Sequence, residues 1–178
     1  EEAVRRIQSS DRVVVAHATG EPSYLLAAMV ANADQYENVE IVHMVAMGKA
    51  EYCKPEYDRD CHHNSLFLGA TPRAAAAEGR ADFTPVFFSE IPSVLEEILH
   101  PNVAMIQVSP PDEHGYVSLG VSVDYTKTAA EVADLVIAQV NNQPPRPFGD
   151  AFLHLTHLDC PVATDHPAIE LTPPHNPD

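Results

Sequence analysis

The stretch "RVVVAHATGEPSYLLAAMV", residues 12–30, indicates the fold. Its first five residues, 12–16, are an arginine followed by a short apolar run, which is typical of a strand buried on both faces of a parallel sheet. Gly20 permits a tight turn, and Pro22 suits the first position of a helix. Apolar residues then recur at the spacing of one helix face, at Leu25, Leu26, Met29, Val30 and Ala33. We therefore predict a strand, a turn and a helix.

The same pattern repeats along the chain. Short apolar runs predict strands at residues 39–46, 64–69, 102–108 and 135–140. Capping signals and helical spacing predict four helices. The first is a short amphipathic helix in residues 1–8, and the second follows an N-cap at Thr71 and ends just before Gly79. The third follows an N-cap at Ser89 with Ile91, Leu95, Ile98 and Leu99 inward, and the fourth is capped by Asp124 with Tyr125, Ala129 and Val132 inward. This alternation predicts an α/β fold with a largely parallel sheet flanked by helices.

The bulk composition disfavours several classes of function. The chain of 178 residues suffices for one core, and no apolar run approaches the roughly 18 residues that a membrane span needs. The formal net charge of −16 argues against nucleic acid and membrane as partners, because the ten Lys and Arg residues form no basic patch. Three cysteines without regular spacing are typical of a reducing compartment, so we expect a cytoplasmic protein.

A metal site is one chemical alternative. Cys53, Cys61, His62 and His63 have side chains that zinc prefers. Structural zinc sites use close pairs such as Cys-x2-Cys, however, and seven residues separate Cys53 from Cys61. Adjacent histidines also point in different directions on most backbones. We therefore predict no metal site.

Ligands of parallel α/β folds bind beyond the carboxyl ends of the strands, so the loops after Ala16, Ala46, Phe88 and Val108 are candidates. In "HATGEP" (17–22), main-chain N–H groups could face an anion, or the segment could be an ordinary turn. In "HMVAMGKAEY" (43–52), an apolar strand end with a glycine suits the presentation of N–H groups to a developing oxyanion. We interpret His43 as a hydrogen-bonded core histidine rather than as a base.

The turn in "QVSPPDEHGYVSLGVSVDYT" (107–126) holds three adjacent polar residues, Asp112, Glu113 and His114. The two prolines stop the preceding strand, because proline cannot donate a hydrogen bond to the sheet. Asp112 can accept nearby main-chain N–H groups, and Gly115 can adopt a positive φ. We therefore predict that these four residues shape the rim of a cleft rather than perform chemistry.

Several long motifs resemble a known family. They are "GEP" (20–22), "VEIVHMVAMGKAEY" (39–52), "HHNSLFLG" (62–69), "ADFTPVFFSEIP" (81–92), "VAMIQVSPPDEHGYVSLGVSVDYTK" (103–127) and "VIAQVN" (136–141). Together they are similar to the N-terminal half of the acetyl-CoA hydrolase/transferase family, within it most of all to the 4-hydroxybutyrate and butyryl-CoA:acetate CoA-transferases. The resemblance implies a CoA-transferase domain of the NagB/RpiA-like fold over residues 1–171, with residues 172–178 as the start of an interdomain linker.

The resemblance also implies a reaction. Family members bind acyl-CoA between two related domains, and a glutamate of the C-terminal domain attacks the thioester in a ping-pong mechanism. That domain is absent from these 178 residues, so we assign the nucleophile to none of the chain's glutamates and expect this piece to be inactive alone. Coenzyme A enters as substrate, and no tightly bound cofactor is implied. The expected partners are an acyl-CoA, a short-chain carboxylate, the C-terminal domain and, at full length, further copies of the protein.

For this half, the resemblance implies that two loops face the acyl group and the acceptor carboxylate. The first consists of Gly20, Glu21 and Pro22, and the second of Val45, Ala46, Met47 and Gly48. We expect a main-chain N–H group of the second loop to act as an oxyanion donor. Two alternatives remain: an acyl-CoA hydrolase, in which water resolves the intermediate, and an acidic binding module without catalysis.

Overall fold

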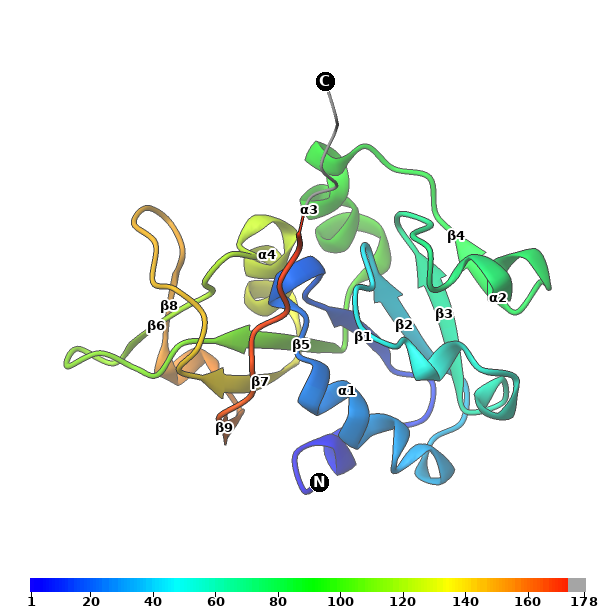
Figure 1. Ribbon diagram of the computed structural model, residues 1–178, viewed down its shortest axis with the longest axis horizontal. Helices are drawn as coiled ribbons and strands as arrows, with labels where there is room; N and C mark the ends of the chain where they lie inside the picture. The colour runs from blue at the N-terminus through cyan, green and yellow to red at the C-terminus, as the bar shows by residue number, and fades with distance from the viewer. Residues whose placement is uncertain (173–178) are drawn as a thin grey trace.

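A computed structural model describes residues 1–172 and shows a central parallel sheet (Figure 1). Within these residues the sheet has seven strands in the order β4-β3-β2-β1-β5-β7-β9, and all neighbouring pairs are parallel. The strands are β1 (Arg12–Val15), β2 (Val39–His43), β3 (Cys61–Ser65), β4 (Ala81–Phe83), β5 (Val103–Val108), β7 (Leu135–Asn141) and β9 (Cys160–Thr164). Two others, β6 (Tyr116–Ser118) and β8 (Phe152–His154), form a separate antiparallel ribbon. The predicted α/β class is confirmed.

Short helices connect the strands. The α-helices are α1 (Ser23–Val30), α2 (Arg73–Ala77), α3 (Ile91–Val94) and α4 (Asp124–Val132), and a π-helical turn, η7 (Leu95–Leu99), continues α3. The 3-10 turns are η1 (Val4–Arg6), η2 (Ala18–Gly20), η3 (Ala33–Gln35), η4 (Glu51–Cys53), η5 (Pro55–Tyr57), η6 (Phe88–Glu90) and η8 (Leu155–His157). In the described part of the chain, every helix is too short or too polar to cross a membrane.

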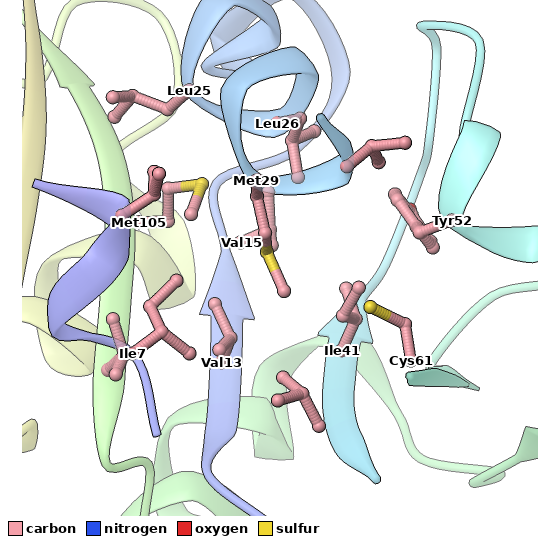
Figure 2. Packing of buried hydrophobic residues seen from close by; sticks show 14 of the residues in the cluster. Ile7, Val13, Val15, Leu25, Leu26, Met29, Ile41, Tyr52, Cys61 and Met105 are labelled. Carbon is pink, nitrogen blue, oxygen red and sulfur yellow. The ribbon is translucent and has the colours of Figure 1, made fainter. Parts of the chain in front are cut away.

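Two hydrophobic clusters cover the two faces of the sheet. In the first, Leu26 and Met29 of α1 lie over Val13 of β1 (Figure 2). Val14, the next residue of β1, belongs to the second cluster, which also contains Tyr125 of α4. Because successive residues of a strand point to opposite faces, a strand covered on both sides must be apolar throughout. This explains the run of valines that opens the chain's first strand–turn–helix unit.

The connections change direction between β1 and β5. The strands β2, β3 and β4 lie on one side of β1, whereas β5, β7 and β9 lie on the other. A reversal of this kind separates the loops at the carboxyl ends of the two central strands and leaves a crevice there. The loops after β1 and β2 therefore lie at the edge of the sheet where ligands of this fold class bind.

Two predicted strands and one predicted helix have wrong boundaries. The strand expected at 64–69 is β3, which ends at Ser65, and the strand expected at 39–46 ends at His43. The error at β3 has a physical cause: the prediction followed the apolar residues 66–68, whereas the strand buries the polar side chains of residues 63–65. The helix expected in residues 1–8 is only the single turn η1. The short strands β4, β6, β8 and β9 were not predicted, because none contains a long apolar run.

Some helix predictions also need correction. Thr71 and Ser89 do not cap helices, because α2 and α3 begin after Pro72 and Glu90 without a side-chain cap hydrogen bond. Two residues expected to point inward are exposed: Ile98 by 67% and Val132 by 38%. The remaining inward residues named for these two helices are buried: Ile91, Leu95, Leu99, Tyr125 and Ala129.

Candidate functional site

The carboxylate of Glu21 lies buried beyond the carboxyl ends of β1 and β2. The residue directly follows η2 and is only 4% exposed. Its Oε2 accepts hydrogen bonds from the main-chain N–H groups of Met47 (3.1 Å) and Gly48 (3.0 Å), and its Oε1 accepts one from the hydroxyl of Ser23 (3.1 Å). The structure therefore brings together the two loops that the sequence analysis selected.

Close packing at this carboxylate depends on two glycines. A Cβ atom on Gly48 would lie 2.1 Å from Oε1 of Glu21, so a larger residue would displace the carboxylate. A Cβ atom on Gly20 would lie 2.3 Å from the Cβ atom of Ser122. Neither glycine has a positive φ. These two positions therefore need glycine because neighbouring side chains approach the backbone closely, not because of the backbone conformation. The sequence predicted Pro22 as the first residue of the helix. In the structure Pro22 directly precedes α1, which begins at Ser23.

The four amides of the second loop fall into two pairs. Those of Met47 and Gly48 are bound to Glu21. Those of Val45 and Ala46 donate no hydrogen bond to any group in residues 1–172. The Val45 carbonyl also accepts the N–H of Ala18 at 2.9 Å, which ties the second loop to the first. An oxyanion donor from this loop would therefore come from its first half, unless Glu21 moves.

Two buried histidines, His43 and His63, lie beside Tyr52. His43 is fully buried, its Nδ1 lies 2.9 Å from the hydroxyl of Tyr52, and its Nε2 lies 3.9 Å from Oε2 of Glu21. The ring of His63 lies 5.5 Å from that of Tyr52, and neither of its nitrogens has a hydrogen-bond partner within residues 1–172. The interpretation of His43 as a hydrogen-bonded core histidine is confirmed.

Burial controls the charge state of these groups. It lowers the pKa of His63 to about 4 and holds that of His43 well below its ordinary value, so both rings are neutral at pH 7. Burial also raises the pKa of Glu21, although the hydrogen bonds from Gly48, Ser23 and Met47 act in the opposite direction. The cluster therefore combines neutral rings with one carboxylate held by fixed donors.

A pocket of about 360 Å³ opens beside Glu21. Its walls are mainly apolar and come from α1 and from the segment after β2, including Leu26, Val30, Met47 and Tyr52. The volume lies in the range of small-molecule sites, which are typically apolar with a few polar groups. Tyr52 joins this pocket to the hydrophobic cluster under α1 (Figure 2).

A second hollow, of about 490 Å³, lies at the opposite edge of the sheet. Its lining includes Val103 and Leu135, the first residues of β5 and β7, together with Arg5, Arg6 and Asp134. Ligands of open parallel sheets bind at the carboxyl ends of strands, and this hollow lies at the amino ends. We therefore take the pocket beside Glu21 as the candidate site.

A histidine–aspartate pair that the sequence analysis did not select lies at the switch point between β1 and β5. Nε2 of His17 lies 2.9 Å from Oδ2 of Asp124, the first residue of α4. The His17 ring lies near those of Tyr125 (5.1 Å between centroids) and Phe88 (6.1 Å). The sequence signal was a histidine placed directly after a buried strand, together with an aspartate at a predicted helix start.

The polar turn after β5 has a different geometry. Oδ1 of Asp112 accepts the N–H groups of His114 (3.0 Å) and Tyr116 (2.9 Å), and its Oδ2 pairs with Arg146 (2.8 Å). The side chains of Glu113 and His114 are 86% and 75% exposed, and Gly115 has a φ of +82°. These contacts build a turn, as predicted for Asp112 and Gly115, whereas the place of the four residues at the rim of a cleft stays a prediction.

The residues considered for a metal site do not gather. His62 pairs with Asp82 at 2.8 Å near the surface, whereas its neighbour His63 is buried. Throughout residues 1–172, no three His, Cys, Asp or Glu side chains are placed to hold a metal ion together.

Comparison with known proteins places the chain in a family. Residues 1–171 match the acetyl-CoA hydrolase/transferase N-terminal domain. The chain belongs to this family. It is 54% identical, over 98% of its length, to the 4-hydroxybutyrate coenzyme A transferase of Clostridium kluyveri, and 31% identical, over 95%, to the butyryl-CoA:acetate CoA-transferase of Anaerostipes caccae. It covers 41% and 39% of these two acetyl-CoA hydrolase/transferase relatives, or about two fifths of their length.

Solved structures agree with this assignment to the acetyl-CoA hydrolase/transferase family. RipA from Yersinia pestis superposes with a TM-score of 0.91 at 28% identity, covering 98% of this chain and 43% of RipA. A 4-hydroxybutyrate CoA-transferase from Porphyromonas gingivalis superposes with a TM-score of 0.78 at 32% identity, covering 93% of this chain and 38% of that protein. The predicted CoA-transferase fold is thereby confirmed.

Proposed function

We propose that this chain is the N-terminal half of a CoA-transferase that moves CoA between a short-chain acyl-CoA and a carboxylate such as acetate. The observation that carries the proposal is the 54% identity to a 4-hydroxybutyrate coenzyme A transferase, which extends over 98% of the chain. The mainly apolar pocket beside Glu21 supports it, because a short acyl chain needs apolar walls and few polar contacts.

The proposed chemistry is a ping-pong exchange. A glutamate of the C-terminal domain attacks the thioester carbonyl, and the C–S bond breaks to release the CoA thiolate and leave a mixed anhydride. The thiolate then attacks the glutamyl carbonyl, which releases the acyl group as a carboxylate and leaves a glutamyl-CoA thioester. An acceptor carboxylate reverses the two steps. Each attack places negative charge on a carbonyl oxygen, which needs a hydrogen-bond donor.

In this proposal the present half supplies one wall of the cleft. The amide of Ala46 is the donor that we assign to the oxyanion, since Met47 and Gly48 already bind Glu21. Four phenylalanines near the carboxyl ends of β3 and β4 are at least half exposed, namely Phe67, Phe83, Phe87 and Phe88. Such an apolar edge supports the proposal that the C-terminal domain covers this side of the sheet.

The test uses the complete protein that contains these residues. It is incubated with 4-hydroxybutyryl-CoA, with and without acetate, and acetyl-CoA formation is followed together with free CoA. Transfer that requires acetate is the expected result. Release of free CoA at the same rate without acetate would instead identify a hydrolase.

A second measurement locates the nucleophile. The protein is incubated with acyl-CoA alone, digested, and searched by mass spectrometry for a glutamate that carries CoA. We expect the adduct outside residues 1–178. An adduct on Glu21 or on any other glutamate of this chain would overturn the assignment of the nucleophile to the C-terminal domain.

A further inference from the structure

The carboxylate of Glu21 has unused hydrogen-bonding capacity beside the pocket. A carboxylate offers about four lone-pair positions, and three of them are filled, two on Oε2 and one on Oε1. The remaining position belongs to Oε1, the atom that packs against the backbone of Gly48. Glu21, Ser23 and Gly48 all line the pocket, so a ligand there can reach this oxygen.

The carboxyl group of Glu21 is fixed in place. Its three donors hold both oxygens, and the main-chain donors belong to a loop that the Ala18 N–H also ties down at 2.9 Å. Two other charged residues line the pocket, Lys49 and Glu51, but Lys49 is exposed, and Glu51 is paired with Lys54 at 3.3 Å. A buried charge acts much more strongly on a neighbour than a hydrated one. Glu21 therefore dominates the electrostatics of the pocket wall.

From this geometry we propose that Glu21 is the specificity-determining residue for the end of the acyl chain. It selects chains that end in a hydroxyl or methyl group over chains that end in a carboxylate. A terminal hydroxyl donates to the free position on Oε1, and a methyl group packs on the apolar wall. A terminal carboxylate brings a second negative charge beside the first without a donor between them. The inference rests on the proposed function, because it assumes that the acyl chain enters this pocket.

Two acyl groups of nearly equal size test the proposal. 4-Hydroxybutyryl-CoA and succinyl-CoA differ at the chain end, where one has a hydroxymethyl group and the other a carboxylate. The values of kcat/KM for both are measured on the complete protein with acetate as acceptor. The wild type is expected to prefer 4-hydroxybutyryl-CoA, and Glu21→Gln is expected to reduce the preference by about tenfold or more. Glutamine keeps the size and can still accept the two main-chain hydrogen bonds, so the main change is the lost charge.

The matched control is Glu56→Gln, which removes the same charge from an exposed residue in η5, outside the pocket. It should leave the ratio of the two kcat/KM values unchanged. An unchanged ratio in an active Glu21→Gln protein would overturn the proposal. So would an equal fall of the ratio in Glu56→Gln, because a net-charge effect would then suffice.

A wild-type measurement covers the case in which Glu21→Gln does not fold. Succinate and 4-hydroxybutyrate are compared as inhibitors of acetyl-CoA formation from butyryl-CoA. Succinate should bind about tenfold more weakly or worse, and equal inhibition by both acids would contradict the proposal. A protein that transfers CoA from none of these thioesters would fail at the proposed function instead, and the inference would fall with it.

Discussion

Glu21 and Asp112 use the same chemistry in two regions of the molecule, with different results. Each carboxylate accepts two main-chain N–H groups in a loop beyond a strand of the parallel sheet. The donors to Asp112 lie two and four residues away in its own turn, whereas those to Glu21 lie 26 and 27 residues away. A carboxylate with local donors builds a turn, and one with distant donors joins two loops into a site.

Burial separates the two carboxylates further. Burial raises the pKa of Glu21 above its ordinary value of 4.5. The folded protein therefore loses stability as the pH rises from 4.5 towards that raised pKa. The hydrogen bond from the Tyr116 N–H, the strongest influence, lowers the pKa of Asp112 below its ordinary value of 3.8. The charged form therefore stabilises the folded protein, and this stabilisation is lost as the pH falls from 3.8 towards the lowered pKa. The turn is stabilised by its charge, whereas the buried loop junction carries its charge at a cost. Function is a common reason to retain such a costly arrangement.

The largest effect is expected from Gly48→Ala in the complete protein. The new Cβ atom would lie 2.1 Å from Oε1 of Glu21 and must displace a buried carboxylate from its donors. Breaking a buried charged network of this kind costs about 3–5 kcal/mol of the free energy of unfolding. Chemical denaturation followed by circular dichroism measures it. Gly69→Ala is the matched control, since a Cβ atom there meets nothing within 4 Å; equal losses in both variants would show that Glu21 is not pinned as described.

His63, buried beside Tyr52, predicts a loss of stability between pH 6.5 and pH 4. Burial lowers the pKa of His63 from 6.5 to about 4, so the unfolded chain binds a proton that the folded chain refuses between these values. Stability should therefore fall by ~3 kcal/mol as the pH decreases from 6.5 to 4. His63→Leu should remove this part of the loss in denaturation curves measured across that range. A His63→Leu curve identical to the wild type would contradict the prediction.

The same contrast explains what the sequence could predict. The run of valines at residues 13–15 and the helical spacing after it are local signals, and they predicted the α/β fold and the loops of the site. The motif resemblance predicted the family. The contact between Glu21 and the amides of Met47 and Gly48 could not be predicted, because no local pattern encodes donors 26 residues away.

Other misses have the same origin. His63 and Ser65 are polar residues in a buried strand, and only the tertiary fold covers them. The pair of His17 and Asp124 is 107 residues apart in the chain, and the switch point between β1 and β5 brings it together. In contrast, the contacts by which Asp112 and Gly115 build the turn were predicted, because the amides that Asp112 binds belong to His114 and Tyr116 of the same turn. Their contacts to Arg146, His154 and Leu155 are distant in the chain and were not predicted.

The loop after β2 allows a sharper test of catalysis. Ala46→Pro removes the N–H group that we assign to the oxyanion and should lower kcat/KM of CoA transfer by about 100-fold or more. Ala46→Gly keeps that N–H group and should retain most of the activity. Circular dichroism confirms that both variants are folded. A folded Ala46→Pro protein with normal kcat/KM would exclude this amide and return attention to Val45, the other amide without an acceptor in the described residues.

The smallest effects are expected in the turn, although it holds the most conspicuous polar cluster of the sequence. The double variant Glu113→Gln, His114→Ala should change kcat/KM less than twofold and the free energy of unfolding by no more than about 0.5 kcal/mol, because solvent surrounds both side chains. Asp112→Ala should lower the thermal midpoint without changing kcat/KM, because it removes the acceptor of the His114 and Tyr116 amides. Enzyme assays and thermal unfolding of the complete protein check both. A large loss of activity in the double variant would give this turn a direct role with substrate, and the separation between local and distant donors would no longer distinguish a turn from a site.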